Sequence, residues 1–184
     1  MDLRKFIDNS RTDKDTLHSY LETYEKLFKD KRLTSTEIME IGVSNGGSIK
    51  LWNDYFENAS IYGLDIMDMR DNIQDIKDYP RIKLYLNINA YNINTQLFNK
   101  KFDIIIDDGD HQLSNQIIFI KNYLPILEED GLLIIEDIQR IEDIQILTNE
   151  TPEEYKKYIE VYDLRENKNR YDDILFVINK NKRI

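Results

Sequence analysis

The chain has 184 residues, a net charge of −10, 41% hydrophobic residues and no cysteine. Its length suits one domain of roughly 100–200 residues with a packed core, and the missing cysteines exclude disulfides, thiolate metal sites and a cysteine nucleophile. The acidic balance disfavours nucleic acid as a partner. Because no run approaches the ~20 apolar residues of a membrane span and no apolar secretory signal opens the chain, we expect a cytoplasmic protein without membrane association.

Apolar runs of strand length alternate along the chain with stretches of helical period. The first 35 residues predict a helical cap, whose apolar stripe consists of Leu17, Tyr20, Leu21, Tyr24, Leu27 and Phe28. Seven apolar runs predict strands, at residues 36–41, 60–65, 82–86, 102–107, 131–136, 158–164 and 174–179. Residues 48–56 and 113–127 carry apolar side chains at helical spacing and therefore predict helices between the strands.

Strands separated by helical segments indicate βαβ units and a mainly parallel sheet. We therefore predict an α/β, Rossmann-like fold with helices on both faces of the sheet. In this prediction residues 1–184 form one domain, with the helical cap over 1–35 and the Rossmann-like core over 36–184. The sequence leaves open whether the cap packs on its own domain or on a second copy in a homo-oligomer.

A glycine-rich loop follows the first predicted strand. Its candidate cofactor-binding residues are Glu40, Gly42, Ser44, Asn45, Gly46 and Gly47. Glycines let the backbone turn sharply and approach a ligand closely, and the following helix offers free N–H groups. Asp65 ends the second predicted strand, where an acid accepts hydrogen bonds from ribose hydroxyls. Ile66 follows it and is expected beside the same ligand.

The loop and Asp65 alone do not separate a nicotinamide cofactor from S-adenosylmethionine. Glu40 favours S-adenosylmethionine, because a carboxylate inside the strand just before the glycines suits the cationic amino-acid end of that molecule. The simpler alternatives are a plain strand-to-helix turn for the loop and a capping or solvated acid for Asp65.

Acidic residues end the fourth and fifth predicted strands. The fourth strand runs into Asp107, Asp108, Gly109, Asp110 and His111, and the fifth runs into Glu136 and Asp137. Parallel strands bring these ends to the cofactor edge of the sheet, where several carboxylates repel each other unless they are protonated or bridged by a cation. Hard oxygen ligands without cysteine favour Mg²⁺ or a similar ion.

His111 stands three residues after Asp108 and is the candidate general base. A neutral imidazole beside a metal can accept the proton of a substrate hydroxyl that the metal has made more acidic. Methyl transfer from a sulfonium needs such a nucleophilic oxygen. The structural alternatives are a buried or turn residue for Asp107, a helix cap for Asp110, a structural histidine for His111 and a strand terminus for Glu136 and Asp137.

Taken together, these segments resemble the metal-dependent sugar O-methyltransferases that act on macrolide antibiotics, of the mycinamicin and macrocin type. They also resemble related short methyltransferases of polysaccharide and sugar-nucleotide pathways. The matching stretches are residues 12–28, 40–56, 61–66, 102–117, 131–138 and 165–178. The paired IDDGDH and IEDI motifs are the most specific part of the resemblance.

The resemblance implies a seven-stranded sheet with its last strand antiparallel, and it implies roles for the site residues. Asp108, Glu136 and Asp137 would hold Mg²⁺, and His111, beside Asp108, would deprotonate the sugar hydroxyl. The glycine loop, Asp65 and Asp107 would hold S-adenosylmethionine. Three residues belong to an N-terminal segment that closes over the site in this family, Lys14 toward the cofactor and His18 and Tyr20 toward the substrate.

Two positions depart from the pattern of that family. Asp110 replaces a usual serine and adds negative charge beside the expected metal and substrate. Asn89 stands near the position where the family often has an acid close to the adenine, and its side-chain oxygen can accept a hydrogen bond from the adenine amine.

The predicted function is S-adenosylmethionine-dependent and Mg²⁺-dependent O-methylation of a sugar-containing small molecule. One alternative is a metal-dependent nucleotide-sugar glycosyltransferase that uses Asp108 and Asp110 as a D-x-D site. The others are a nicotinamide oxidoreductase and a non-catalytic Rossmann-like binding protein. The identity of the acceptor and of the methylated hydroxyl stays open.

Overall fold

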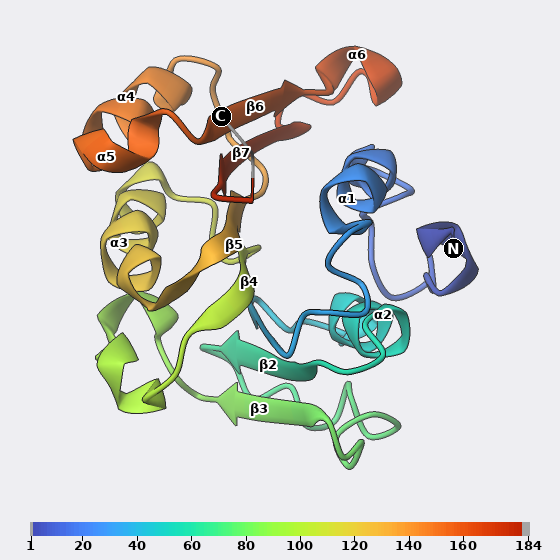
Figure 1. The fold of residues 1–184 in the computed structure, drawn as a ribbon. Helices are drawn as coiled ribbons and strands as arrows, with labels where there is room; N and C mark the ends of the chain where they lie inside the picture. Colours follow the sequence, from blue (N-terminus) through green and yellow to red (C-terminus); the bar gives the residue numbers. More distant parts are fainter. Residues whose placement is uncertain (1, 182–184) are drawn as a thin grey trace.

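The computed structural model describes residues 2–181, which form a seven-stranded sheet in the order β3-β2-β1-β4-β5-β7-β6 (Figure 1). The strands are β1 (Glu37–Ile41), β2 (Ser60–Asp65), β3 (Ile82–Leu86), β4 (Phe102–Asp107), β5 (Leu127–Ile135), β6 (Ile159–Asp163) and β7 (Ile174–Asn179). The pairs among β1 to β5 are all parallel, whereas β7 is antiparallel to both β5 and β6. The predicted seven-stranded Rossmann-like sheet with an antiparallel last strand is therefore confirmed.

Helices cover both faces of this sheet, as predicted (Figure 1). The α-helices are α1 (Tyr20–Phe28), α2 (Gly47–Tyr55), α3 (Leu113–Tyr123), α4 (Asp143–Glu150), α5 (Glu153–Lys156) and α6 (Arg165–Lys168). Short 3-10 turns are η1 (Leu3–Lys5), η2 (Ala90–Asn92), η3 (Thr95–Phe98) and η4 (Leu124–Ile126). Helices α1 and α2 lie on one face with the N-terminal segment, and α3, α4 and α5 lie on the other. Within residues 2–181, none of the helices combines the length and the apolarity that crossing a membrane requires.

Two predicted helices differ from the observed ones. The expected helix over the first 35 residues is wrong for most of that stretch, since α1 begins only at Tyr20. The preceding residues form turns, in which the Asp13 carbonyl accepts hydrogen bonds from the Thr16 and Leu17 amides, and Leu17 is 53% exposed rather than part of the buried stripe. The helix expected over 113–127 ends at Tyr123, because proline lies in the following 3-10 turn and has no N–H to donate.

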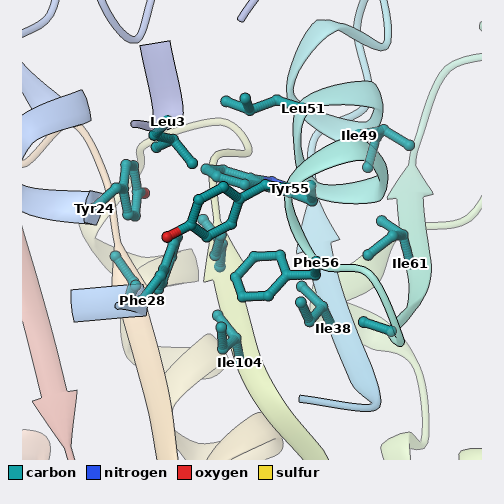
Figure 2. Packing of buried hydrophobic residues seen from close by; sticks show 14 of the residues in the cluster. Leu3, Tyr24, Phe28, Ile38, Ile49, Leu51, Tyr55, Phe56, Ile61 and Ile104 are labelled. Carbon is teal, nitrogen blue, oxygen red and sulfur yellow. The ribbon is translucent and has the colours of Figure 1, made fainter. Parts of the chain in front are cut away.

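The core consists of two apolar layers, one on each face of the sheet. Side chains alternate along β4, so that Ile104 belongs to the layer under α1 and α2 while Ile105 belongs to the layer under α3. Figure 2 shows Phe28 of α1 beside Phe56, which follows α2, and their ring centroids are 5.3 Å apart. This aromatic packing joins α1 to α2, and it thereby holds the chain that precedes α1 close to the glycine loop that precedes α2.

Replacing Ile104 with valine tests this layer. The side chain is fully buried, so the loss of one methylene should lower the free energy of unfolding by about 0.5–1.5 kcal/mol. Urea unfolding followed by circular dichroism measures the change, and Ile146→Val is the matched control because Ile146 is 39% exposed. Equal effects of the two substitutions would contradict the assignment of Ile104 to the core.

Candidate active site

The glycine loop between β1 and α2 adopts a backbone that only glycine allows at its first turn. Gly42 has φ +92°, and a Cβ atom at this position would lie 1.9 Å from the carbonyl oxygen of Asp108. The loop therefore packs directly against the chain that leaves β4. Ser44 and Gly46 also have positive φ values, of 45° and 70°. The predicted cofactor loop and the predicted acidic cluster are thus in direct backbone contact.

Asp65, at the end of β2, organises this loop. Its Oδ2 atom accepts hydrogen bonds from the amides of Val43 (2.8 Å) and Ser44 (3.1 Å), and its Oδ1 atom accepts one from Met67 (2.8 Å). The sequence predicted a contact from this carboxylate to a ligand. In the structure it first holds the backbone of the loop in place, and its remaining lone pairs stay available to ribose hydroxyls.

Asp65→Asn should loosen the loop, because an asparagine amide nitrogen would face backbone N–H groups that need an acceptor. We expect the free energy of unfolding to fall by about 1–3 kcal/mol, and binding of S-adenosylhomocysteine to weaken with it. Thermal unfolding and calorimetric titration measure the two effects. Asp68→Asn is the control, because Asp68 pairs with Arg70 on the exposed surface after β2. If Asp65→Asn bound S-adenosylhomocysteine as tightly as the wild type, Asp65 would not contribute to the cofactor site.

Two cavities open at this edge of the sheet, and they share Gly42, Ser44, Asp108 and Gly109. The strap cavity, of about 490 Å³, lies between the glycine loop and residues 9–19, which we call the strap. The β2 cavity, of about 240 Å³, lies beside the end of β2. Predicted site residues that line the strap cavity are Gly42, Ser44, Asn45, Gly47, Asp108, His111 and Asp137. Those that line the β2 cavity include Asp65, Ile66, Asn89 and Asp110.

A second group of predicted residues is buried and lines neither cavity. It comprises Lys14, His18, Tyr20, Glu40, Gly46, Asp107 and Glu136. The Lys14 ammonium lies 2.7 Å from Oδ2 of Asp108, 2.7 Å from each carboxylate oxygen of Glu136 and 3.4 Å from Oε1 of Glu40. The structure therefore places Lys14 against carboxylates and not against either cavity, and its predicted contact with the cofactor stays a prediction.

Burial and mutual repulsion shift the pKa values of the carboxylates around Lys14. Burial raises the pKa of Glu40 to about 7 and that of Glu136 well above its usual value, although Lys14 opposes both changes. Burial by itself would lower the pKa of Lys14, but Asp108, Glu136 and Glu40 outweigh it and raise that pKa. The cluster consequently needs a positive charge at its centre, and Lys14 supplies one.

His111 and Asp137 lie side by side on the wall of the strap cavity, with Nε2 of His111 3.5 Å from Oδ2 of Asp137. Both residues have positive φ values, 58° and 54°, which are uncommon for residues other than glycine. The Nδ1 atom of His111 is buried and has no hydrogen-bond partner among residues 2–181. An unfavourable backbone conformation of this kind persists only where the surrounding contacts hold it in place, and such residues often cluster at functional sites.

His18 and Tyr20 lie behind Asp137 and line neither cavity, and their predicted contact with the substrate stays a prediction. The Tyr20 hydroxyl donates a hydrogen bond to Asp137, and the buried His18 ring lies 3.2 Å from the same carboxylate. Both side chains are at most 1% exposed, so the structure assigns them to the support of Asp137. Burial raises the pKa of Asp137, and Asp108 adds to the increase.

Asp110 lies in the turn that precedes α3 and is not a helix cap, because Gln112 is the N-cap residue of α3 and the helix has no side-chain cap hydrogen bond. Its carboxylate accepts hydrogen bonds from the amide of Gln112 (3.1 Å) and the side chain of Asn115 (2.6 Å) at the start of α3. Sequence reasoning missed Tyr24 and Tyr91 as polar members of the site. The Tyr24 hydroxyl donates to Glu136, and the Tyr91 hydroxyl donates to Asp107 over 2.7 Å. Tyr24 was predicted as part of the apolar stripe, and no local pattern marks Tyr91.

Two sets of donor atoms suit a cation. Asp108, His111 and Asp137 offer ligand atoms within 4.8 Å of one another, and so do Glu40, Asp108 and Glu136. The first set opens onto the strap cavity, whereas the second surrounds Lys14. Carboxylate oxygens of this kind fit Mg²⁺ or a similar hard ion. The three acids predicted as metal ligands, Asp108, Glu136 and Asp137, are thus divided between two neighbouring positions that share Asp108.

Comparisons with known proteins identify relatives of this chain. No protein-family model matches the chain. The chain is 30% identical over 135 residues to the mycinamicin VI 2''-O-methyltransferase of Micromonospora griseorubida, covering 66% of this chain and 32% of that protein. It is 28% identical over 138 residues to the 8-demethyl-8-alpha-L-rhamnosyl tetracenomycin-C 2'-O-methyltransferase of Streptomyces olivaceus, covering 70% of this chain and 35% of that protein. The chain therefore spans about a third of the length of these relatives.

Solved structures give the same fold. The mycinamycin-pathway methyltransferase MycE, in complex with Mg, SAH and mycinamycin VI, superposes with a TM-score of 0.73 at 24% identity, over 97% of this chain and 53% of that chain. A putative rRNA methylase from Clostridium thermocellum superposes with a TM-score of 0.68 at 13% identity, over 88% of this chain and 95% of that chain. At these identities the likeness establishes the fold.

Proposed function

Because the chain is a homologue of the macrolide and sugar O-methyltransferases and has the class I methyltransferase fold, we propose that it transfers a methyl group from S-adenosylmethionine to a sugar hydroxyl. One observation carries this proposal: the glycine loop, the acids Asp108 and Asp137, and His111 line a single cavity. A methyl donor, a cation and a proton acceptor are the three elements that O-methylation of a poorly acidic hydroxyl uses.

The residues present fit S-adenosylmethionine and a divalent cation. The close approach of Gly42 to the backbone of Asp108 brings the glycine loop and the acids to the same cavity, and the β2 cavity offers Asp65, Ile66 and Asn89 to an adenosine group. Asp108 and Asp137 offer hard oxygen atoms to a cation at the strap cavity. When bound, S-adenosylmethionine supplies an electrophilic methyl group and the cation makes the acceptor hydroxyl more acidic.

His111 is the proton acceptor in this proposal. Its Nδ1 atom is buried, so Nε2 is the ring nitrogen that faces the cavity and takes the proton of the acceptor hydroxyl. Asp137 lies 3.5 Å from Nε2 and stabilises the imidazolium that forms. Tyr20 and His18 in turn hold Asp137 from the buried side.

The alternative functions find less support. A D-x-D glycosyltransferase site needs both acids at a metal, whereas the Asp110 carboxylate is occupied by contacts at the start of α3. A nicotinamide oxidoreductase gives no use to the buried acids around Asp108. The curated relatives are named for methylation of rhamnosyl, macrocin and mycinamicin groups, and a sugar-containing acceptor is the class that we propose for this chain.

Thermal unfolding with S-adenosylhomocysteine, NAD and a sugar nucleotide tests the cofactor class. A ligand at 100 times its Kd adds about 2.7 kcal/mol to the free energy of unfolding, and we expect this gain with S-adenosylhomocysteine alone. Transfer of labelled methyl groups to a panel of rhamnosides and other glycosides, with Mg²⁺ or with a chelator, then tests the reaction. Stabilisation by NAD or by the sugar nucleotide in place of S-adenosylhomocysteine would replace the proposal by the corresponding alternative.

A further inference from the structure

The strap is held to the core by three basic side chains that each reach a different acceptor. Arg11 donates to the carbonyl oxygen of Asn45 in the glycine loop (3.0 Å), and it pairs with Asp75 at 2.6 Å. His18 lies against Asp137 at the other end of the strap. Between them, Lys14 enters the acidic cluster and is 1% exposed. The strap is therefore fastened at its centre by a single buried ammonium group.

Lys14 occupies the place that a cation shared by Asp108 and Glu136 would take. Its Nζ atom is 2.7 Å from Oδ2 of Asp108 and 2.7 Å from both carboxylate oxygens of Glu136. A Mg²⁺ ion binds such oxygens at about 2.0–2.1 Å, so it would have to lie within a few ångströms of the ammonium. Two positive charges at that separation in a buried site repel strongly. Lys14 and a divalent cation that uses Glu136 therefore exclude each other.

The ionised cluster is also destabilised when it holds no positive charge. Glu40 and Glu136 are at most 2% exposed, and Asp108 and Asp137 lie beside them. Buried carboxylates without a counter-ion are strongly destabilising. When Lys14 leaves, these carboxyls must therefore take up protons or bind another cation, and a divalent cation supplies twice the charge that leaves.

We propose that Lys14 is a displaceable internal cation, which a divalent ion binding to Asp108 and Glu136 expels, so that metal binding frees the centre of the strap. This inference rests on the proposed function, whose cation it extends from Asp108 to Glu136, and it adds an exchange that couples the cation to the strap. The strap lines one side of the 490 Å³ cavity, so the exchange changes access to that cavity. Arg11 and Lys168, which binds the carbonyl oxygens of Asp15 and His18, keep the ends of the strap attached.

The chain contains its own reporter for this exchange. Trp52 is the only tryptophan, and its indole N–H donates to Oε2 of Glu40 over 2.9 Å. The other oxygen of Glu40 faces Lys14 at 3.4 Å. Exchange of the cation beside Glu40 alters the electrostatic environment of the indole, so Trp52 fluorescence reports it without any turnover.

The first experiment compares magnesium binding by the wild type, Lys14→Met and Lys26→Met, with no S-adenosylmethionine present. Lys26→Met removes the same charge from an exposed pair with Glu22 on α1. We expect Lys14→Met to bind Mg²⁺ roughly ten-fold more tightly or better, a usual size for coupling between two competing ligands, and Lys26→Met to match the wild type. Calorimetry and Trp52 fluorescence measure the affinities. Equal or weaker binding by a folded Lys14→Met would overturn the proposal.

A second measurement uses the wild type alone, so it stands even if Lys14→Met fails to fold. The amides of Thr16, Leu17 and His18 each donate to the Asp13 carbonyl over 3.0 Å. We expect Mg²⁺ to speed hydrogen exchange of these amides, and unchanged protection, or no Mg²⁺ binding at all, would refute the exchange. Binding of S-adenosylhomocysteine to the same samples without Mg²⁺ tests the proposed function separately.

Discussion

Replacing His111 with asparagine should lower the turnover number for methyl transfer by roughly 10²–10⁴-fold, the usual contribution of a positioned proton acceptor. Asparagine tolerates the positive φ of 58° found at this position, so the backbone should keep its conformation. The amide cannot accept the proton of the acceptor hydroxyl. Because His111 lines the cavity without supporting the glycine loop, binding of S-adenosylhomocysteine and the free energy of unfolding should change little.

The measurement combines steady-state kinetics of methyl transfer with calorimetric titration of S-adenosylhomocysteine. Ser114→Ala, on the exposed side of α3 just after the same turn, is the control. A fall in turnover of less than about ten-fold would mean that another group accepts the proton.

Gly42→Ala is expected to disrupt the cofactor loop. The added Cβ would meet the carbonyl oxygen of Asp108 at 1.9 Å, and the φ of +92° is unfavourable for any side chain. Backbone strain alone costs roughly 1–3 kcal/mol in the free energy of unfolding. Relief of the clash also requires the loop and the chain after β4 to separate, so binding of S-adenosylhomocysteine should weaken by at least about ten-fold, or 1.4 kcal/mol.

Ser44→Gly is the matched control for this substitution, because it removes a side chain from the same loop whereas Gly42→Ala adds one. Ser44 has a φ of 45°, and glycine adopts that conformation without steric cost. Thermal unfolding should therefore place Ser44→Gly at or slightly above the wild type and Gly42→Ala clearly below it. The assignment of the loop would be wrong if Gly42→Ala kept both its stability and its affinity for S-adenosylhomocysteine.

The sheet and the composition of its edge could be predicted from sequence patterns. Strands buried on both faces are continuous apolar runs, so β2, β4 and β7 have the predicted bounds. β3 also has its predicted bounds, although its residues alternate between buried and more exposed positions. Parallel strands end at one edge, and for this reason the loop containing Gly42 lies against Asp108, with His111 and Asp137 on the same cavity. The roles of these residues stay proposals, because they depend on ligands and not on the chain alone.

Only the tertiary structure decided which residues of the cluster face the cavity and which are buried behind it. Lys14 pairs with Asp108 and Glu136 across 94 and 122 residues of sequence, and contacts between such distant residues leave no local pattern. The helical period of the N-terminal stripe predicted more helix than forms, because α1 is stabilised by packing from Tyr20 onward while the strap is held by polar contacts to the core. Local patterns record propensity and burial, whereas the position of a buried charge depends on every partner that the fold brings to it.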